Sequence, residues 1–451
     1  MDQSLYPSSR WDDDRIGKPL KKFVAILVGL VIVLAACARA PTTPLPSPTI
    51  TPRPVPTDSL VITNGIVIDG TGAPPIANGI VIISQNKIAA VGRAADFAIP
   101  TQANTIDAQG NTIMPGIINA HVHDAASPLV RQFYFLQRGV TSVCDVGSSL
   151  TALTRAREPS SFKITARGFF SGPIINAPNG YPGAPELLYA VTNPREARLA
   201  VSDLVRRGAD YIKIALEPWN WKLPWPIAER DAIPNLSLAE LQAIVDQAHQ
   251  EGKLVRAHLG TAEMLDLALE SGVDALEHVP LPRLEDIDFR TNSPDYADLS
   301  AAYEAQLARI VQHNVIMTPT LDKIISWCES YAVREERKIL CRKYALTPVY
   351  RFHQMGGIVA LGDDSASDSR TWMPIQEMRR LLEAGLTPME VIQAGTLYAA
   401  RVCGHRDELG TLTPGKLADV IIVEGNPLKN IDAMNNVRVV IINGQVAVPA
   451  K

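Results

Sequence analysis

The alternation of apolar runs with amphipathic or long-loop segments between Ile113 and Ala400 constrains the fold of this chain more than any other feature. We find apolar runs that begin near residues 114, 141, 163, 211, 254, 275, 315 and 358. Eight strands separated by helices predict an α/β fold, the (β/α)8 TIM barrel, in which functional groups gather at the carboxyl ends of the strands. The hydrophobic content of 46% over 451 residues suits such a packed core and excludes disorder for most of the chain.

The two ends of the folded region have another pattern, of short strands and turns. Near the amino terminus the apolar runs cover residues 60–65, 79–83 and 88–92, and near the carboxyl terminus they cover 418–423 and 437–443. Asn64-Gly65 and Asn443-Gly444 are strong turn signals. Both ends are therefore predicted to be rich in β-strands.

The segment before the folded region resembles a bacterial lipoprotein signal peptide. Lys21 and Lys22 precede an apolar run over 23–34, and Leu34-Ala35-Ala36-Cys37 has the form of a lipobox. The run is shorter than the ~20 residues that a membrane-spanning helix needs. The resemblance implies that residues 1–37 contain the signal and that Cys37 becomes the lipidated amino terminus. The long, partly acidic start leaves an uncleaved anchor open.

Residues 38–57 are rich in proline and threonine and lack apolar periodicity, which predicts an extended tether. Together with the signal, this tether predicts a protein outside the cytoplasm, lipid-anchored to the bacterial cell membrane. The formal net charge is −4, with no basic block after residue 60, so the sequence has no electrostatic footprint for nucleic acid. A small molecule is the expected substrate.

Several predicted strands carry a potential metal ligand at or near their carboxyl end. His121 and His123 point to the same face of one strand, because residues i and i+2 do so, and they can hold one ion together. Alone, such a pair is more often a surface feature. Four further strands strengthen the metal hypothesis, with Lys213, His258, His278 and Asp364.

These residues lie in motifs that resemble the amidohydrolase superfamily, in its imidazolonepropionase-like and Xaa-Pro dipeptidase-like branch. The motifs are MPGIINAHVH (114–123), GADYIK (208–213), LEH (276–278), LGDD (361–364) and PGKLAD (414–419), and the similarity runs over about 60–446. The resemblance implies a barrel over 116–405, beside a small β-sandwich built from 58–115 and 406–451.

The same resemblance implies a site with two divalent metal ions, most suitably Zn²⁺. By position, His121, His123 and Asp364 would hold the first ion, and His258 and His278 the second. Lys213, carboxylated to a carbamate, would bridge them.

The family pattern aligns Asp364, rather than Asp363, with the aspartate that binds metal and transfers a proton. Tyr181 stands in a loop where many relatives have a histidine, and it could donate a hydrogen bond to the substrate carbonyl or be an ordinary loop aromatic. Trp219, Trp221 and Trp225 suggest an aromatic wall for the substrate or a cap on the barrel.

We therefore predict a metal-dependent hydrolase in which a water activated by two metals cleaves an amide bond of a dipeptide or N-acyl amino acid. A lactonase or cyclic-amide hydrolase is the nearest alternative, and a non-catalytic metal-binding surface lipoprotein is another. Deamination is disfavoured because no His-x-x-Glu follows the fifth strand.

The remaining cysteines and histidines have structural interpretations. Cys144 is expected to be a buried thiol, and Cys403 has no visible partner. Cys328 and Cys341 flank a charged helix-like stretch, and a disulfide between them is left open. Glu277 is expected to point away from the barrel mouth. The other histidines are assigned to helices and their ends: His249, His313, His353 and His405.

Overall fold

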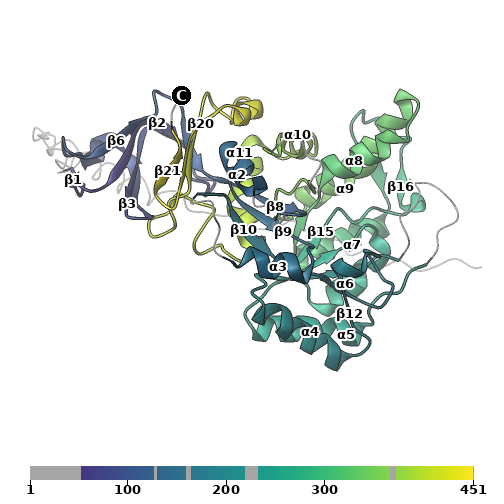
Figure 1. Ribbon diagram of the computed structural model, residues 1–451. Coiled ribbons are helices and arrows are strands. Elements are labelled where there is room, and N and C mark those ends of the chain that lie inside the picture. Colours follow the sequence, from purple (N-terminus) through teal and green to yellow (C-terminus); the bar gives the residue numbers. More distant parts are fainter. Residues whose placement is uncertain (1–51, 126–129, 159–163, 219–231, 366–371, 450–451) are drawn as a thin grey trace, which may run out of the picture. The chain divides into compact units, whose positions relative to one another are not determined.

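Parallel strands form the centre of the molecule in the computed structural model (Figure 1), which describes residues 52–125, 130–158, 164–218, 232–365 and 372–449. One parallel sheet contains β8 (Ile117–Val122), β9 (Val140–Asp145) and β10 (Arg167–Phe170). A second contains β11 (Ile174–Asn176), β12 (Leu188–Ala190), β13 (Ile212–Ala215), β14 (Val255–His258), β15 (Ala275–Glu277) and β18 (Ile316–Thr318).

Backbone hydrogen bonds connect the two sheets at both edges. Asp210 N donates to Phe170 O at 2.9 Å between β10 and β13. On the other side the segment 358–365 links β18 to β8, through bridges Met317 to Val359 and Val122 to Ser365. The result is a TIM-barrel-like α/β domain, as predicted. The last predicted strand, near Ile358, forms only these isolated bridges.

Helices follow most of the strands and cover them, as Figure 1 shows. They are α2 (Val130–Gln137), α3 (Leu150–Ala156), α4 (Pro194–Arg206), α5 (Leu238–Gln250), α6 (Leu265–Ser271), α7 (Ala301–Gln312), α8 (Leu321–Ser330), α9 (Glu335–Gln354), α10 (Ile375–Glu383), α11 (Pro388–Gln393) and α12 (Ala399–Val402). Their starts have local causes. For example, Ser237 and Glu240 form a capping box at α5, and Leu241, Ile244 and Ala248 form its buried face.

The second domain is a mixed sheet formed by both ends of the folded region. It contains β2 (Leu60–Val67), β3 (Ile76–Ser84), β4 (Lys87–Arg93), β6 (Asn104–Asp107), β7 (Thr112–Pro115), β19 (Val420–Val423), β20 (Val437–Ile442) and β21 (Gln445–Val448). In Figure 1 the purple and yellow strands lie together, although they are far apart in the sequence. The join is β7 with β19, where Met114 pairs with Ile421.

One local prediction for this sheet was wrong, and another stays a prediction. We expected a sandwich; the strands are hydrogen-bonded in one continuous sheet, in which the first half of β2 pairs with β6 and its second half with β7, and this pairing does not test whether the sheet folds into two layers. We also expected a turn at Asn64-Gly65, but the pair lies inside β2 at a register shift, where Asn64 has φ 56°. A left-handed residue can form a bulge as readily as a turn. Asn443-Gly444 is a turn, between β20 and β21.

The sulfur chemistry differs from the prediction. Cys144 and Cys403 form a disulfide between β9 and the end of α12, so Cys144 is not a free thiol and Cys403 has a partner. The sequence separation of 259 residues hid this pair. Cys328 and Cys341 are also bonded, with Cα atoms 5.8 Å apart. The stretch between them is not one helix, because α8 ends and α9 starts there, which brings the two cysteines together.

Small strands complete the fold. β1 (Arg53–Pro54) pairs with β5 (Phe97–Ala98), so the last part of the predicted tether packs against the sheet, and β16 (Ile287–Asp288) pairs with β17 (Asp298–Leu299). The predicted signal segment, Cys37 and the three tryptophans of 219–225 lie outside the described residues. Within the described residues, no helix is both long and apolar enough to span a bilayer.

Candidate active site

The predicted ligands lie on the strand ends of the barrel-like domain. His121 lies in β8, Lys213 in β13 and His258 at the end of β14, and His278 directly follows β15. All four side chains are buried, and Lys213 is only 1% exposed. Parallel strands that end at one edge bring together residues that are distant in sequence.

The tightest group of possible metal ligands is His121, His278 and Asp364, whose ligand atoms all lie within 4.8 Å of one another. His123 joins this group through Asp364, because its Nε2 lies 3.2 Å from Asp364 Oδ1. The rings of His258 and His278 have centroids 4.6 Å apart. The structure therefore brings all predicted histidines to one place. His278, predicted as a ligand of the second ion, lies beside two ligands predicted for the first, His121 and Asp364.

Glu277 determines how His121 faces this group. His121 Nδ1 lies 2.6 Å from Glu277 Oε2, and Arg256 Nε donates to Glu277 Oε1 at 2.6 Å. Burial would raise the pKa of Glu277, but Arg256 and Lys213 outweigh it and hold the pKa well below the usual range. Because an ionised carboxylate only accepts hydrogen bonds, Nδ1 of His121 must donate. Nε2 then carries the free lone pair.

That lone pair faces another electron-rich atom. Among the residues that the structure describes, His121 Nε2 is buried without a hydrogen-bond partner, and it lies 3.6 Å from Asp364 Oδ1. Burial lowers the pKa of His121 to about 4, so the ring is neutral at pH 7. A neutral imidazole nitrogen and a carboxylate oxygen repel each other at this distance, and a cation between them would turn the repulsion into binding.

Lys213 is the second buried group without a partner. Its Nζ makes no hydrogen bond in the described part of the chain. Burial lowers the pKa of Lys213 to about 7, so that much of it is neutral at neutral pH. A neutral amine is the nucleophilic form, which carbamate formation with carbon dioxide requires.

The backbone is strained where the strands end. His278, Thr320 and Asp364 have φ angles of 74°, 50° and 52°, in the left-handed region, which is uncommon for residues other than glycine and a true outlier for a β-branched residue such as Thr320. Thr320 contacts His278 directly, with Oγ1 2.6 Å from Nδ1. Two of these residues thus belong to the ligand group, and the third contacts one of them.

The choice between the adjacent aspartates agrees with the geometry. Asp364 lies against His121 and His123, whereas Asp363 accepts a hydrogen bond from Asn119 Nδ2 at 2.7 Å, away from the histidines. Burial would raise the pKa of Asp364, but the hydrogen bond with His123 and the charges of the histidines lower it. Asp364 is therefore an ionised carboxylate that can accept a proton.

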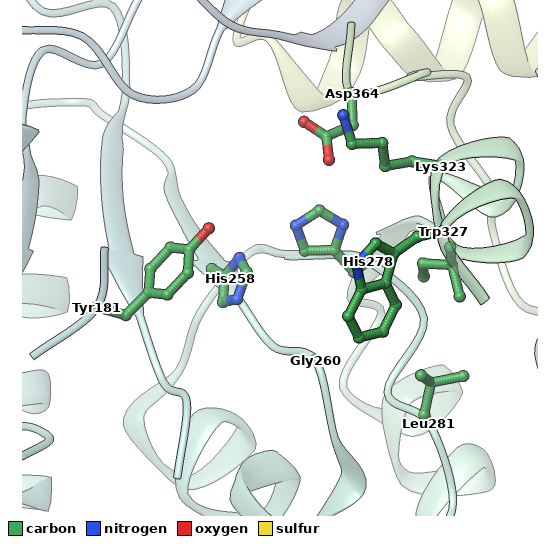
Figure 2. Close-up of a pocket in the computed structure, with 9 residues that line it drawn as sticks. Tyr181, His258, Gly260, His278, Leu281, Lys323, Trp327 and Asp364 are labelled. Carbon is green, nitrogen blue, oxygen red and sulfur yellow. The ribbon is translucent and has the colours of Figure 1, made fainter. Parts of the chain in front are cut away.

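Tyr181 lies at the other wall of the site. Its ring stacks on His258 with centroids 4.0 Å apart, as Figure 2 shows. Burial raises the pKa of Tyr181 far above its usual value, so the phenol stays a hydrogen-bond donor. His258 Nε2 also lies 3.3 Å from Glu217 Oε2, and Glu217 is a buried residue that the sequence analysis missed. Its signal was its place two residues after the end of β13, where side chains that follow a barrel strand face the site.

These side chains open into a cavity of about 250 Å³. Its lining includes Tyr181, His258, His278 and Asp364, together with Lys323 and Trp327 of α8 (Figure 2). The α8 residues were not predicted as part of the site, because nothing in their local sequence indicates which helix covers the strand ends.

Glu277 and the four histidines with structural interpretations lie as predicted, unlike Cys144 and Cys403. Glu277 points to Arg256 and His121, behind the ligand group. The remaining histidines contact surface or helical partners away from the cavity, His249 with Asp274, His353 with Glu390 and His405 with Glu408. His313 caps the end of α7.

The fold and the ligand group define an α/β protein with a second sheet domain and a candidate metal site. Residues 112–447 match the Amidohydrolase family, and the chain belongs to this family. Family membership makes it a hydrolase of carbon–nitrogen bonds.

Individual relatives are more distant. Ochratoxinase of Aspergillus niger is 26% identical over 425 residues, with 82% of each chain covered. An imidazolonepropionase of Porphyromonas gingivalis is 24% identical, covering 76% of this chain and 82% of its own. A crystal structure of a Xaa-Pro dipeptidase with bound methionine superimposes with a TM-score of 0.69 at 23% identity, over 87% of this chain and all of the other.

Proposed function

We propose that the protein is a metal-dependent amide hydrolase with two divalent ions, most suitably Zn²⁺, at the strand ends. The observation that carries this proposal is the buried, unpartnered Nε2 of His121 facing Asp364 at 3.6 Å. Two such groups without a cation between them would be costly to bury. We also propose that the parallel strands close into a complete eight-stranded barrel.

The donor set fits such ions, since imidazole nitrogen and carboxylate oxygen are ordinary zinc ligands. His121, His123 and Asp364 would hold one ion, and His258 and His278 the other. Lys213, as a carbamate, would supply the bridging oxygen. When bound, the ions would polarise the scissile carbonyl and lower the pKa of a water molecule.

The residues of the chain then divide the remaining work. Asp364, ionised in the structure, would accept a proton at Oδ1 or Oδ2 and return it to the leaving amine. Tyr181, kept as a phenol, would donate a hydrogen bond to the substrate carbonyl oxygen. Glu277 would hold His121 in the tautomer that directs Nε2 to the site.

For the substrate we propose a dipeptide or an N-acyl amino acid. Similarity to an ochratoxinase and to a Xaa-Pro dipeptidase supports a small-molecule substrate. For the location we keep the proposal of a lipid anchor at Cys37, which rests on the lipobox alone.

The first experiment measures metal content and hydrolysis together, on purified residues 52–451. The substrates are N-acyl amino acids, dipeptides, lactones and cyclic amides. We expect about two metals per chain and release of amine, both abolished by a chelator and restored by Zn²⁺. Cleavage of lactones alone would favour the lactonase.

The matched variants are Asp364→Asn and Asp363→Asn. They change neighbouring carboxylates to the same amide, but only Asp364 faces the histidines. We expect Asp364→Asn to lose activity by at least about 10³-fold, and Asp363→Asn to retain most of it. Full metal loading without turnover of any substrate would support a metal-binding lipoprotein, and no bound metal would reject the proposed site.

A further inference from the structure

One side of the cavity is built from a single helix. Lys323, Ile324 and Trp327 all line it from α8, and Leu281 continues their apolar surface. Lys323 and Ile324 precede Trp327 by four and three residues, the spacings at which helix side chains are neighbours, so α8 presents one cation and two apolar groups to the cavity. Figure 2 shows the Lys323 side chain extending toward Asp364, with the Trp327 indole beside His278.

The position of α8 is well determined at both ends. At its start, the amides of Leu321 and Asp322 donate to the two carboxylate oxygens of the buried Glu377, at 2.9 and 2.7 Å. Near its end, Cys328 is bonded to Cys341 of α9. A helix held in this way presents its side chains at a fixed distance from the strand ends.

Among the described residues that line this cavity, Lys323 is the only lysine or arginine, and within the described chain it forms no salt bridge. The one carboxylate of this described lining, Asp364, is already paired with His123. The amine therefore adds a positive charge that no side chain of the described site neutralises. An anionic group of a bound molecule would neutralise it.

We propose that Lys323 binds a free carboxylate of the substrate, while Trp327, Ile324 and Leu281 contact an apolar group attached beside it. This inference rests on the proposed hydrolase function and narrows its substrate class. The preferred molecules would be amides whose amine part carries a carboxylate and a bulky apolar side chain. Lactones and cyclic amides without a carboxylate would lack this contact.

The arrangement of the cavity agrees with this division. The scissile carbonyl would lie between Tyr181 and the ligand group, and Lys323 extends from α8 on the Asp364 side of the cavity, away from Tyr181 (Figure 2). In an N-acyl amino acid, the carboxylate is two bonds from the amide nitrogen. Both groups can thus be contacted within one cavity of about 250 Å³.

The test compares two substrates that differ only in the carboxylate, N-benzoylphenylalanine and N-benzoyl-2-phenylethylamine. Benzoate release is measured for the wild type and for Lys323→Met, Lys323→Arg and, as a control on the exposed surface, Lys429→Met. We expect the wild type to prefer the acid by about tenfold or more in kcat/KM, mainly through KM. Lys323→Met should bring the ratio near one, whereas Lys323→Arg and Lys429→Met should keep it.

Salt gives a second readout. Because exposed charges are screened within about 8 Å at physiological ionic strength, raising the salt concentration should reduce the preference in the wild type but not in Lys323→Met. A ratio unaffected by Lys323→Met, with both substrates cleaved, would overturn this inference and leave the hydrolase function intact.

If neither substrate is cleaved, the proposed function is in question, and binding decides about Lys323. Calorimetry then measures the affinity for 3-phenylpropanoate and for 3-phenylpropanol, which lacks the carboxylate. We expect Lys323→Met to weaken binding of the acid about tenfold and to reduce the difference in affinity between the acid and the alcohol. Equal affinity of wild type and variant for the acid would reject the carboxylate contact.

Discussion

The barrel strand ends and the mixed sheet both have buried interiors, but they bury opposite kinds of side chain. In β2, β3 and β20 the buried positions are almost all valine and isoleucine, and the buried Thr112 hydroxyl has a partner in Gly425 O. The barrel strands bury His121, Lys213, Arg256 and Glu277 side by side. The sheet is built for stability, whereas the strand ends hold groups whose burial is unfavourable until a ligand arrives.

The contrast also holds within the charged region. Arg256 and Glu277 neutralise each other, and Glu277 receives a hydrogen bond from His121. Within the described residues, Lys213 Nζ, His121 Nε2 and Glu217 Oε1 have no hydrogen-bond partner. The first set supports the structure, and the second set points to what the site binds. Substitutions in both regions of the molecule can break or sharpen this distinction.

The largest effect is expected for Lys213→Met, which should separate activity from stability. Activity should fall by at least about 10³-fold, because the bridging group is lost. The free energy of unfolding of the metal-free variant should nevertheless exceed that of the metal-free wild type by about 1 kcal/mol, because the substitution removes an unpartnered amine from the core. Steady-state kinetics and thermal unfolding measure the two quantities.

Lys343→Met is the matched control for that experiment. Lys343 is also buried, but its Nζ donates to Ser293 O at 2.7 Å. Its removal should lower stability by about 1 kcal/mol and leave activity almost unchanged. Equal stability changes in the two lysine variants would mean that the unpartnered amine of Lys213 has no special cost.

Glu277→Gln tests the contacts of Glu277 with Arg256 and His121, and it should lower both stability and metal affinity. Arg256 would lose the charge that neutralises it, and breaking a buried ion pair costs about 3 to 5 kcal/mol. Loss of the carboxylate beside His121 should also weaken metal binding by about 10 to 100-fold. Denaturant unfolding and metal titration are the measurements. A variant as stable as the wild type would show that Arg256 finds another partner.

Ile62→Ala is the corresponding change in the mixed sheet, with an effect on stability alone. Ile62 is fully buried in β2, so the cavity left behind should cost about 3 kcal/mol. Activity per folded molecule should change by less than about twofold, because the sheet contributes no group to the cavity. A large loss of kcat/KM at constant fold content would link the two regions and break the comparison.

The sequence predicted the features that repeat or that carry distinctive chemistry. Alternating apolar runs predicted the parallel strands, and the residue types at their ends predicted the histidines, Lys213 and Asp364. Glu217 was missed, although it follows the end of β13 by two residues, because it begins the segment that the sequence analysis interpreted as a loop.

Other misses depend on packing between distant segments. The Cys144–Cys403 bond joins residues 259 positions apart, and Lys323 reaches the cavity only because Glu377 fixes the start of α8. Neither relation leaves a local pattern. The turn expected at Asn64 is absent for a related reason. Pairing of β2 with β3 and β7 continues past this left-handed residue, which forms a bulge inside the strand.

The smallest expected effect concerns backbone strain, which the two regions distribute differently. Left-handed residues in the sheet include Asn64 and Asn443, a residue type that tolerates this conformation, whereas the site has Thr320, a β-branched residue, at φ 50°. We infer that the strain at Thr320 is retained because its hydroxyl contacts His278 Nδ1 at 2.6 Å.

Two variants of Thr320 separate the hydroxyl from the strain. Thr320→Val keeps the branched shape and removes the contact, so kcat/KM or metal affinity should fall about tenfold and stability by about 1 kcal/mol. Thr320→Ser keeps the hydroxyl and removes the methyl branch, so activity should be retained while the free energy of unfolding rises by about 0.5 kcal/mol. Kinetics, metal titration and thermal unfolding distinguish these outcomes. If Thr320→Val stays fully active, the hydroxyl does not position His278, and the left-handed backbone of the site would need another cause than the one that we assign to it.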